Sequence, residues 1–363
     1  EKDSREMKII YFNYIVGLNE QPVGALAKSA AYIRELKALG YDVQVNWQSF
    51  YKKSSNGASE NYVKRTRFRM FLSRFIHEPY KLAQNIWQII DQLKKVNEFK
   101  PDIIFDRLEY YNFAAAFVAA VKGIPLVIEA DSPVIYEYRK FYGKKNIHLP
   151  LLPEAIQKYC LQKAKAVFCI SSAFKKYFAA KGIDPAKMTI TPNGCDPETF
   201  FPRPRDREIE RQYSLQNQTV IGWVGSLYGW AGIENLITLV ETLAEEYDNV
   251  SFLFVGGGRN REIFEEKLQQ HGNKNRVYLP GVVPHGKVND YLSVMDIVLA
   301  PYPKLDFWYA SSMKVFEYMC AGKTVVTANI GQLSHIISQR ENGLLYEPGN
   351  FFDLLAKVRE LLR

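Results

Sequence analysis

The sequence predicts an α/β protein of two doubly wound, parallel-sheet domains, and three observations lead to this prediction. Short runs rich in β-branched and aromatic residues alternate with helical periods from one end of the chain to the other. The 363 residues are too many for one ordinary hydrophobic core. A polar stretch with four prolines, 191–208, separates the runs into two series and is typical of a hinge.

The elements follow in order along each domain. In the first domain, 1–200, strands are expected at 8–12, 42–45, 102–105, 126–128 and 166–170. In the second, 201–363, they are expected at 220–224, 251–255, 277–279, 297–300, 324–326 and 344–345. The clearest helical periods fall at 24–39, 151–164, 232–245 and 313–321. Two such domains facing a central cleft would place ligands at the carboxyl ends of their strands.

One basic segment interrupts the alternation. Residues 62–95 predict a long helical insertion, with Pro79 as a candidate break. Its first half interleaves five basic residues (Lys64, Arg65, Arg67, Arg69 and Arg74) with bulky apolar ones. Such a helix can lie on an anionic membrane surface, here through 62–76. The alternative is an ordinary amphipathic helix packed on its own domain.

Composition narrows the classes of partner. The net charge of +8 favours an anionic partner, which could be a phosphate ligand, a lipid head group or a nucleic acid. No recognition motif accompanies the charge, so a nucleic-acid partner is not expected. The chain is 47% apolar and has no run of eighteen apolar residues, which indicates a globular protein without a transmembrane helix. We expect a cytoplasmic protein, peripheral on the inner face of the membrane.

Cysteine and histidine usage gives no sign of a metal centre. The four cysteines form no CxxC pair, suit a reducing compartment, and are expected as small buried apolar residues. The five histidines show no ligand spacing and are expected at the surface or in caps. We therefore expect no metal and no other cofactor. The GGGRNR run lacks the dinucleotide-binding spacing, which disfavours a nicotinamide-dependent oxidoreductase.

The segment YASSMKVFEYMCAGKTVV carries the strongest functional signal. Small residues, including Ser311 and Ser312, begin a predicted helix, and a helix N-terminus favours phosphate because of its unpaired N–H groups and its dipole. The serine hydroxyls could contact the same anion. Lys314 adds a cation in the first turn, and Glu317 lies one turn further along, where a carboxylate can hold vicinal ribose hydroxyls. A nucleotide diphosphate presents both groups.

This segment resembles the donor-binding segment of family 4 glycosyltransferases of the GT-B fold, in particular the subset S-P-x-K-hydrophobic-F-E-Y-M-A-x-G-K-P-V-V. Six other segments resemble the same family in the correct order. They are GALAKSAAYIRELKALGYDVQV, PNGCDPETF, IGWVGSLYGWAGIENLI, FLFVGGGR, VYLPGVVPHGKVNDYLSVMDIVLAPY and ENGLLYEPGN. The resemblance covers most of the chain. It also implies a further helix after Arg363 that would cross back to the first domain.

The resemblance implies a retaining hexosyltransferase that moves a sugar from a UDP- or GDP-sugar to an acceptor such as a lipid-linked or cell-surface glycan. The first Rossmann-like domain would bind the acceptor and the second the nucleotide sugar. No metal would be needed, because the chain lacks the D-x-D pair of the other large glycosyltransferase fold. Backbone groups near Ser311–Met313, with Lys314, would stabilise the leaving phosphate. The other expected donor-site residues are Ser226, Arg259, Val283, Tyr309, Ser312 and Glu317.

The donor site departs from the family pattern in two places. Tyr309 stands where the family often has an acid near the transferred sugar. Ser226 and Ala231 stand where an Arg and a Lys usually neutralise the phosphates, so Lys314, Arg259 or Arg261 would have to supply the charge. A degenerate GT-B protein that binds a nucleotide or a partner without catalysis is therefore an alternative. A sugar-nucleotide epimerase is another, but the second half lacks a suitable His.

The acceptor half lacks the family's usual His and instead resembles a variant subset with E-V-N-x-P. Arg107 and Glu109 match its strand–helix loop, and Glu129 and Asp131 follow the next strand. Acids at strand ends can bind sugar hydroxyls or act as a general base, so Asp131 and Glu129 are catalytic candidates. The alternative is a helix cap or a salt bridge from Arg107. Gly24 is expected on the acceptor side, with a simple helix-start glycine as the alternative.

Overall fold

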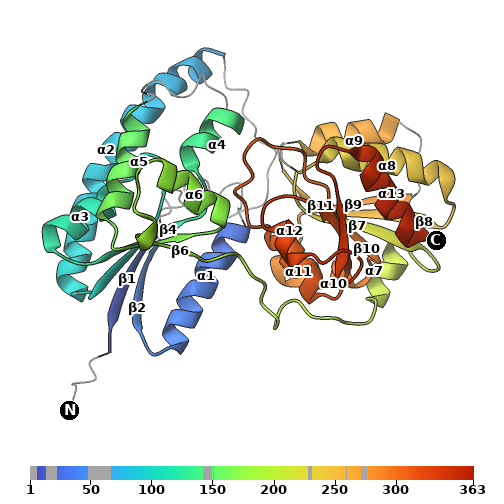
Figure 1. Ribbon diagram of the computed structural model, residues 1–363, viewed down its shortest axis with the longest axis horizontal. Coiled ribbons are helices and arrows are strands. Elements are labelled where there is room, and N and C mark those ends of the chain that lie inside the picture. Colours follow the sequence, from blue (N-terminus) through green and yellow to red (C-terminus); the bar gives the residue numbers. More distant parts are fainter. Residues whose placement is uncertain are drawn as a thin grey trace. The chain divides into compact units, whose positions relative to one another are not determined.

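The computed structural model describes residues 6–13, 23–47, 67–141, 149, 151–227, 231–258, 260–270 and 276–363. The chain divides into two compact units, Glu1–Pro192 and Asn193–Arg363. Each contains one six-stranded sheet in which all neighbouring strands are parallel. Figure 1 shows each sheet with its helices. This confirms the predicted α/β class with two parallel-sheet domains.

The first unit has the strand order β2-β1-β3-β4-β5-β6. Its strands are β1 (Lys8–Asn13), β2 (Asp42–Trp47), β3 (Ile103–Arg107), β4 (Leu126–Ala130), β5 (Ala166–Cys169) and β6 (Met188–Ile190). Its helices are α1 (Val23–Ala38), α2 (Arg67–Phe99), α3 (Ala114–Lys122), α4 (Val134–Phe141), α5 (Leu152–Lys163) and α6 (Ser172–Ala180). The chain order reverses between β1 and β3, so ligands are expected where those two strands end.

The second unit has the strand order β12-β11-β10-β7-β8-β9. Its strands are β7 (Thr219–Ser226), β8 (Val250–Gly257), β9 (Val277–Gly281), β10 (Ile297–Ala300), β11 (Thr324–Ala328) and β12 (Gly343–Tyr346). Its helices are α7 (Arg207–Gln212), α8 (Ile233–Glu246), α9 (Arg261–Gln270), α10 (Val288–Ser293), α11 (Met313–Cys320), α12 (Leu333–Ile336) and α13 (Phe351–Leu362). Here the order reverses between β7 and β10.

The predicted insertion is one 33-residue helix, α2, so the candidate break at Pro79 is wrong. Pro79 is exposed, and a proline removes only its own N–H from the helix ladder. The helix packs against α3 (Figure 1). The Asn85 side chain donates to Tyr111 O at 2.8 Å and accepts from Phe113 N–H at 2.8 Å. Residues 62–66 of the prediction lie outside the described part of the chain.

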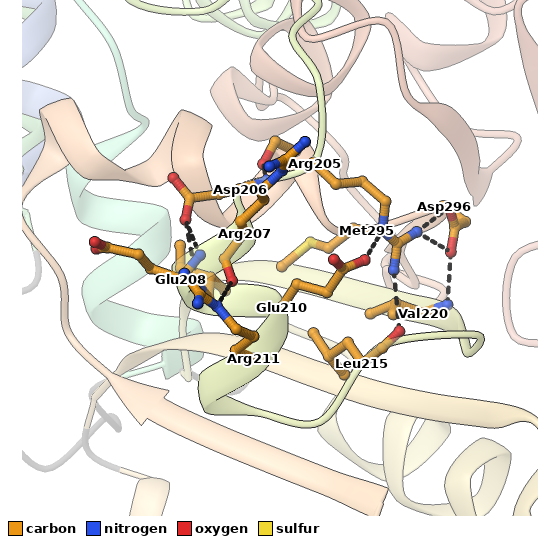
Figure 2. A network of polar contacts seen from close by, with 12 residues as sticks. Arg205, Asp206, Arg207, Glu208, Glu210, Arg211, Leu215, Val220, Met295 and Asp296 are labelled. Carbon is orange, nitrogen blue, oxygen red and sulfur yellow. Dashed lines mark hydrogen bonds and ion pairs between the residues drawn. The ribbon is translucent and has the colours of Figure 1, made fainter.

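A polar network around Arg205 fixes the start of the second unit to its sheet (Figure 2). Arg205 Nη1 lies 2.8 Å from Asp296 Oδ1, and its Nε lies 3.0 Å from Glu210 Oε1. Asp296 Oδ2 in turn accepts from Val220 N–H at 2.8 Å, at the start of β7. Residues 191–204 form no helix or strand. The irregular stretch therefore ends where Arg205 meets the sheet.

The cysteines only partly match their prediction. Cys160 and Cys169 are buried, whereas Cys195 and Cys320 are partly exposed. Burial, and next the neighbouring Cys320, raises the pKa of the Cys195 thiol, although 125 positions separate the two cysteines. Among the described residues, no helix has both the length and the apolar content to cross a bilayer.

Candidate functional site

Two glycines with positive φ lie near the carboxyl ends of neighbouring strands in the second sheet. Gly225 and Gly256, in β7 and β8, have φ values of 150° and 136°. A Cβ at Gly256 would lie 1.8 Å from Gly225 O, so only glycine fits there. A Cβ at Gly225 would lie 2.6 Å from Lys314 Nζ. The absence of a side chain at Gly225 therefore gives the Lys314 ammonium direct access to the backbone of β7.

Helix α11 begins beside Gly225, and the two serines that precede the helix already have hydrogen-bond partners in the protein. Ser311 Oγ accepts from Asn193 N–H at 2.9 Å, and Ser312 Oγ lies 2.5 Å from the Tyr302 hydroxyl. The Ser312 hydroxyl, at the N-cap position, makes no capping hydrogen bond. The N–H groups of Met313 and Lys314 precede the first intrahelical bond. An anion at this helix start would therefore meet these two N–H groups, beside serine oxygens that already have protein partners.

Lys314 lies in the first turn of α11 against aromatic rings. Its Nζ is 4.3 Å from the centroid of the Trp223 ring and 5.8 Å from that of Tyr302. Desolvation lowers the pKa of Lys314 to about 7, and the Glu317 carboxylate only partly opposes that shift. An anion placed at the α11 N-terminus would restore the charged ammonium.

Glu317 lies one turn further along α11 and is 7% exposed. Its Oε1 is 3.1 Å from Nε2 of His285, which begins the short 3-10 turn after β9. The hydrogen bond with Glu317 raises the pKa of His285, and burial acts against it. The expectation of a surface or capping role is therefore wrong for His285. No spacing in the sequence signals this contact, because the two residues belong to different elements, 32 positions apart.

The remaining predicted donor residues lie on three loops of the second unit. Ser226 ends β7 and is exposed, while Val283, after β9, and Tyr309, before α11, are partly buried. Arg261 pairs with Glu265 on its own helix and lies against the end of β9, since a Cβ at Gly281 would lie 2.6 Å from its Nη1. Ala231 is buried and Arg259 lies outside the described residues.

A cluster of paired charges lies at the carboxyl ends of β3 and β4 in the first unit. Arg107 Nη2 is 3.1 Å from Asp131 Oδ2, and Arg107 Nε is 3.5 Å from Glu109 Oε1. Lys28, on α1, pairs with Asp131 and lies 3.1 Å from Glu129 Oε1. The salt bridge between Arg107 and Asp131, which the sequence left as the alternative role, is present.

The acids in this cluster differ in exposure. Glu129 is fully buried and its Oε2 accepts from the Tyr11 hydroxyl at 2.9 Å, whereas the Asp131 side chain is 15% exposed. Burial, and next the charge of Asp131, raises the pKa of Glu129. Burial also raises the pKa of Glu109 to about 7, although Arg107 opposes the shift. Asp131 is thus the better placed of the two catalytic candidates to meet a ligand.

Helix α1 contributes two further residues near this charged cluster. Gly24 is the second residue of that helix, so its position fits the helix-start alternative as well as the acceptor role. Lys28 was missed by the sequence reasoning. Its position one turn after Gly24, on a helix that starts near the carboxyl edge of the sheet, is the signal that could have found it.

Two family models match the chain, one in each unit. Residues 205–363 match the model described as Glycosyl transferases group 1, and residues 30–199 match Glycosyltransferase Family 4. The chain belongs to glycosyltransferase family 4. Among the described residues of this family 4 chain, no group of three or more His, Cys, Asp or Glu side chains is placed to hold a metal ion.

Curated relatives of this family 4 chain are distant. The 2-deoxystreptamine glucosyltransferase of Streptomyces kanamyceticus is 22% identical over 69% of this chain and 64% of its own length. The phosphatidylinositol N-acetylglucosaminyltransferase GPI3 subunit of Saccharomyces cerevisiae is 24% identical over 56% of this chain and 44% of its own length. The chain thus spans less than two thirds of these relatives.

Solved structures establish the fold of this family 4 chain. HepE of Anabaena, in complex with UDP, aligns with a TM-score of 0.66 at 17% identity over 98% of this chain and 90% of that one. WaaG, a glycosyltransferase involved in lipopolysaccharide biosynthesis, aligns with a TM-score of 0.66 at 19% identity over 98% and 90%. The GT-B fold expected from the sequence is confirmed.

Proposed function

We propose that the chain is a retaining, metal-independent glycosyltransferase that moves a hexose from a UDP- or GDP-sugar to an acceptor. The observation that carries this proposal is the start of α11. Backbone donors, the partly desolvated Lys314 and the carboxylate of Glu317 follow one another there in the order of a diphosphate and a ribose. The structure of HepE, which shares the fold, was solved with UDP and with UDP-glucose.

The chemistry needed is stabilisation of the departing phosphate. Negative charge develops on the β-phosphate as the bond from the sugar carbon to the phosphate oxygen breaks. The N–H groups of Met313 and Lys314 and the Lys314 ammonium would stabilise that charge in a site with little water. Glu317 would accept from the ribose hydroxyls. The backbone of 281–284, with Val283, would hold the base, and Ser226 and Tyr309 would border the sugar.

The acceptor would be a polyhydroxylated molecule, such as a lipid-linked or cell-surface glycan, bound at the charged cluster of the first unit. Asp131 is partly exposed and could accept a hydrogen bond from the attacking hydroxyl. The position of the Asp131 carboxylate would be fixed by Glu129, Lys28 and Arg107. The named relatives include a 2-deoxystreptamine glucosyltransferase and a subunit of a phosphatidylinositol N-acetylglucosaminyltransferase, and both 2-deoxystreptamine and phosphatidylinositol carry ring hydroxyls.

The alternative is a degenerate protein that binds a nucleotide without transfer, motivated by the missing cations at Ser226 and Ala231. The position of Lys314 beside Gly225 weakens the reason for this alternative, because Lys314 would supply a positive charge from α11 in place of the missing cations. Incubation with UDP-, GDP- and ADP-sugars, with and without lipid-linked acceptors, tests both. We expect release of nucleoside diphosphate that disappears in Glu317→Ala. Nucleotide binding without turnover on the whole panel would favour the degenerate protein.

We also propose that α2 contacts an anionic membrane surface, so that the protein is peripheral on the cytoplasmic face. The helix starts with Arg67 and Arg69, and further along exposes Tyr80, Ile86, Trp87 and Ile90, with Trp87 72% exposed. Trp87→Ser is expected to reduce sedimentation with vesicles of anionic lipid severalfold. Phe352→Ser, on α13, removes a ring that is 80% exposed and should change nothing. Unchanged sedimentation of Trp87→Ser would refute the contact.

A further inference from the structure

One hydrogen bond joins two parts of the donor site that sequence analysis treats as separate. His285 directly follows the segment 281–284, to which the nucleobase is assigned, and its Nε2 lies 3.1 Å from Glu317 Oε1 on α11. The two side chains are 31% and 10% exposed. The residue that directly follows the loop assigned to the base therefore contacts the carboxylate assigned to the ribose.

The imidazole is held on its other side by the core. Its ring meets Phe200 edge to face, with the centroids 5.2 Å apart, and Phe200 is 1% exposed. Phe200 N–H donates to Asp196 O at 2.9 Å, which fixes that segment. Asp196 and Glu317 are the acids that act on His285, and both favour its protonated form. The ring is therefore held by three segments, 196–200, η4 (His285–Lys287) and α11.

We propose that His285 is a positioning residue for the donor: its Nε2–H holds one oxygen of Glu317 so that the other faces the ribose hydroxyls. This inference rests on the proposed function. A glutamate has three rotatable side-chain bonds, and fixing it before the ligand arrives reduces the entropy lost on binding. The same bond transmits the position of the base loop to the ribose carboxylate. His285 itself touches no reacting atom.

The test compares the affinity for UDP, or for GDP if that binds better, with the affinity for the matching 2′,3′-dideoxynucleoside diphosphate. In the wild type, loss of the ribose hydroxyls is expected to weaken binding by about tenfold. In His285→Leu this discrimination should fall about three- to tenfold, close to that of Glu317→Ala. His285→Gln, whose amide nitrogen can take the place of Nε2, should restore it.

Three further measurements distinguish positioning from a general structural role. His285→Leu added to Glu317→Ala should cause no further loss of discrimination, because the two residues act as one unit. His335→Leu, which alters an exposed histidine on α12, should match the wild type. Thermal unfolding should give similar midpoints for the leucine and glutamine variants at position 285.

Each outcome decides one question. Wild-type discrimination in His285→Leu, or a glutamine variant as impaired as the leucine variant, would overturn the positioning role and leave the proposed function standing. Wild-type protein that binds no nucleoside diphosphate at all would overturn the proposed function, and this inference with it.

Discussion

Lys314→Met is expected to weaken nucleoside diphosphate binding by about 100-fold, because it removes the cation that we propose faces the phosphates and would leave them uncompensated. The loss should be smaller for the nucleoside alone, which carries no phosphate. Calorimetric titration of UDP and uridine, or GDP and guanosine, measures both. Lys304→Met, at an exposed lysine of the loop between β10 and α11, is the matched control and should bind as the wild type does.

The same lysine makes donor affinity depend on pH. Its pKa is lowered to about 7 in the free protein, so the ammonium is largely lost as pH rises above 7, and a bound diphosphate must take up a proton to restore it. Affinity is therefore expected to fall about fiftyfold from pH 7 to pH 9, with about one proton taken up per nucleotide at pH 9. Lys314→Arg stays charged and should bind with nearly constant affinity over this range. An equally steep fall in the arginine variant would contradict the assignment.

Asp131→Asn is expected to lower the rate of sugar transfer by about 100-fold while the affinity for the nucleoside diphosphate stays unchanged. The reason is that Asp131, a partly exposed acid, lies in the first unit, whereas the residues proposed to bind the donor lie in the second. Steady-state transfer and nucleotide titration on the same preparation measure the two effects. Glu35→Gln, at an exposed acid of α1, is the control.

Asparagine at position 131 also leaves Lys28 and Arg107 without that carboxylate, so some loss of stability is expected. Assays should therefore be run well below the midpoint of thermal unfolding of the variant. Transfer within threefold of the wild-type rate would exclude Asp131 as the group that meets the acceptor.

Most of the fold was predictable because parallel strands buried on both faces are short, continuous apolar runs. All eleven expected strands lie in the structure, for example Val250–Gly257 where 251–255 was expected. The one that was missed, β6, has three residues, two of them exposed, so it carries no apolar run. Its place in the sheet depends on pairing with β5, which no local pattern encodes.

The candidate site was predictable only where one segment carries it. Glu317, Lys314 and the start of α11 share one helical stretch, and the family resemblance covers it. The contact of His285 with Glu317 spans 32 positions, and that of Lys28 with Asp131 spans 103, so both depend on tertiary packing. The hydrogen bond between the hydroxyls of Ser312 and Tyr302 also depends on tertiary packing. A hydroxyl with a tertiary partner cannot be distinguished from a free one in the sequence alone.

The most direct test of the account is amide hydrogen exchange at Met313 and Lys314, measured by NMR with and without a saturating nucleoside diphosphate. Backbone donors at the start of α11 that hold the phosphates should exchange at least about tenfold more slowly in the complex. Unchanged exchange at both amides, while the nucleotide is demonstrably bound elsewhere on the chain, would contradict the account.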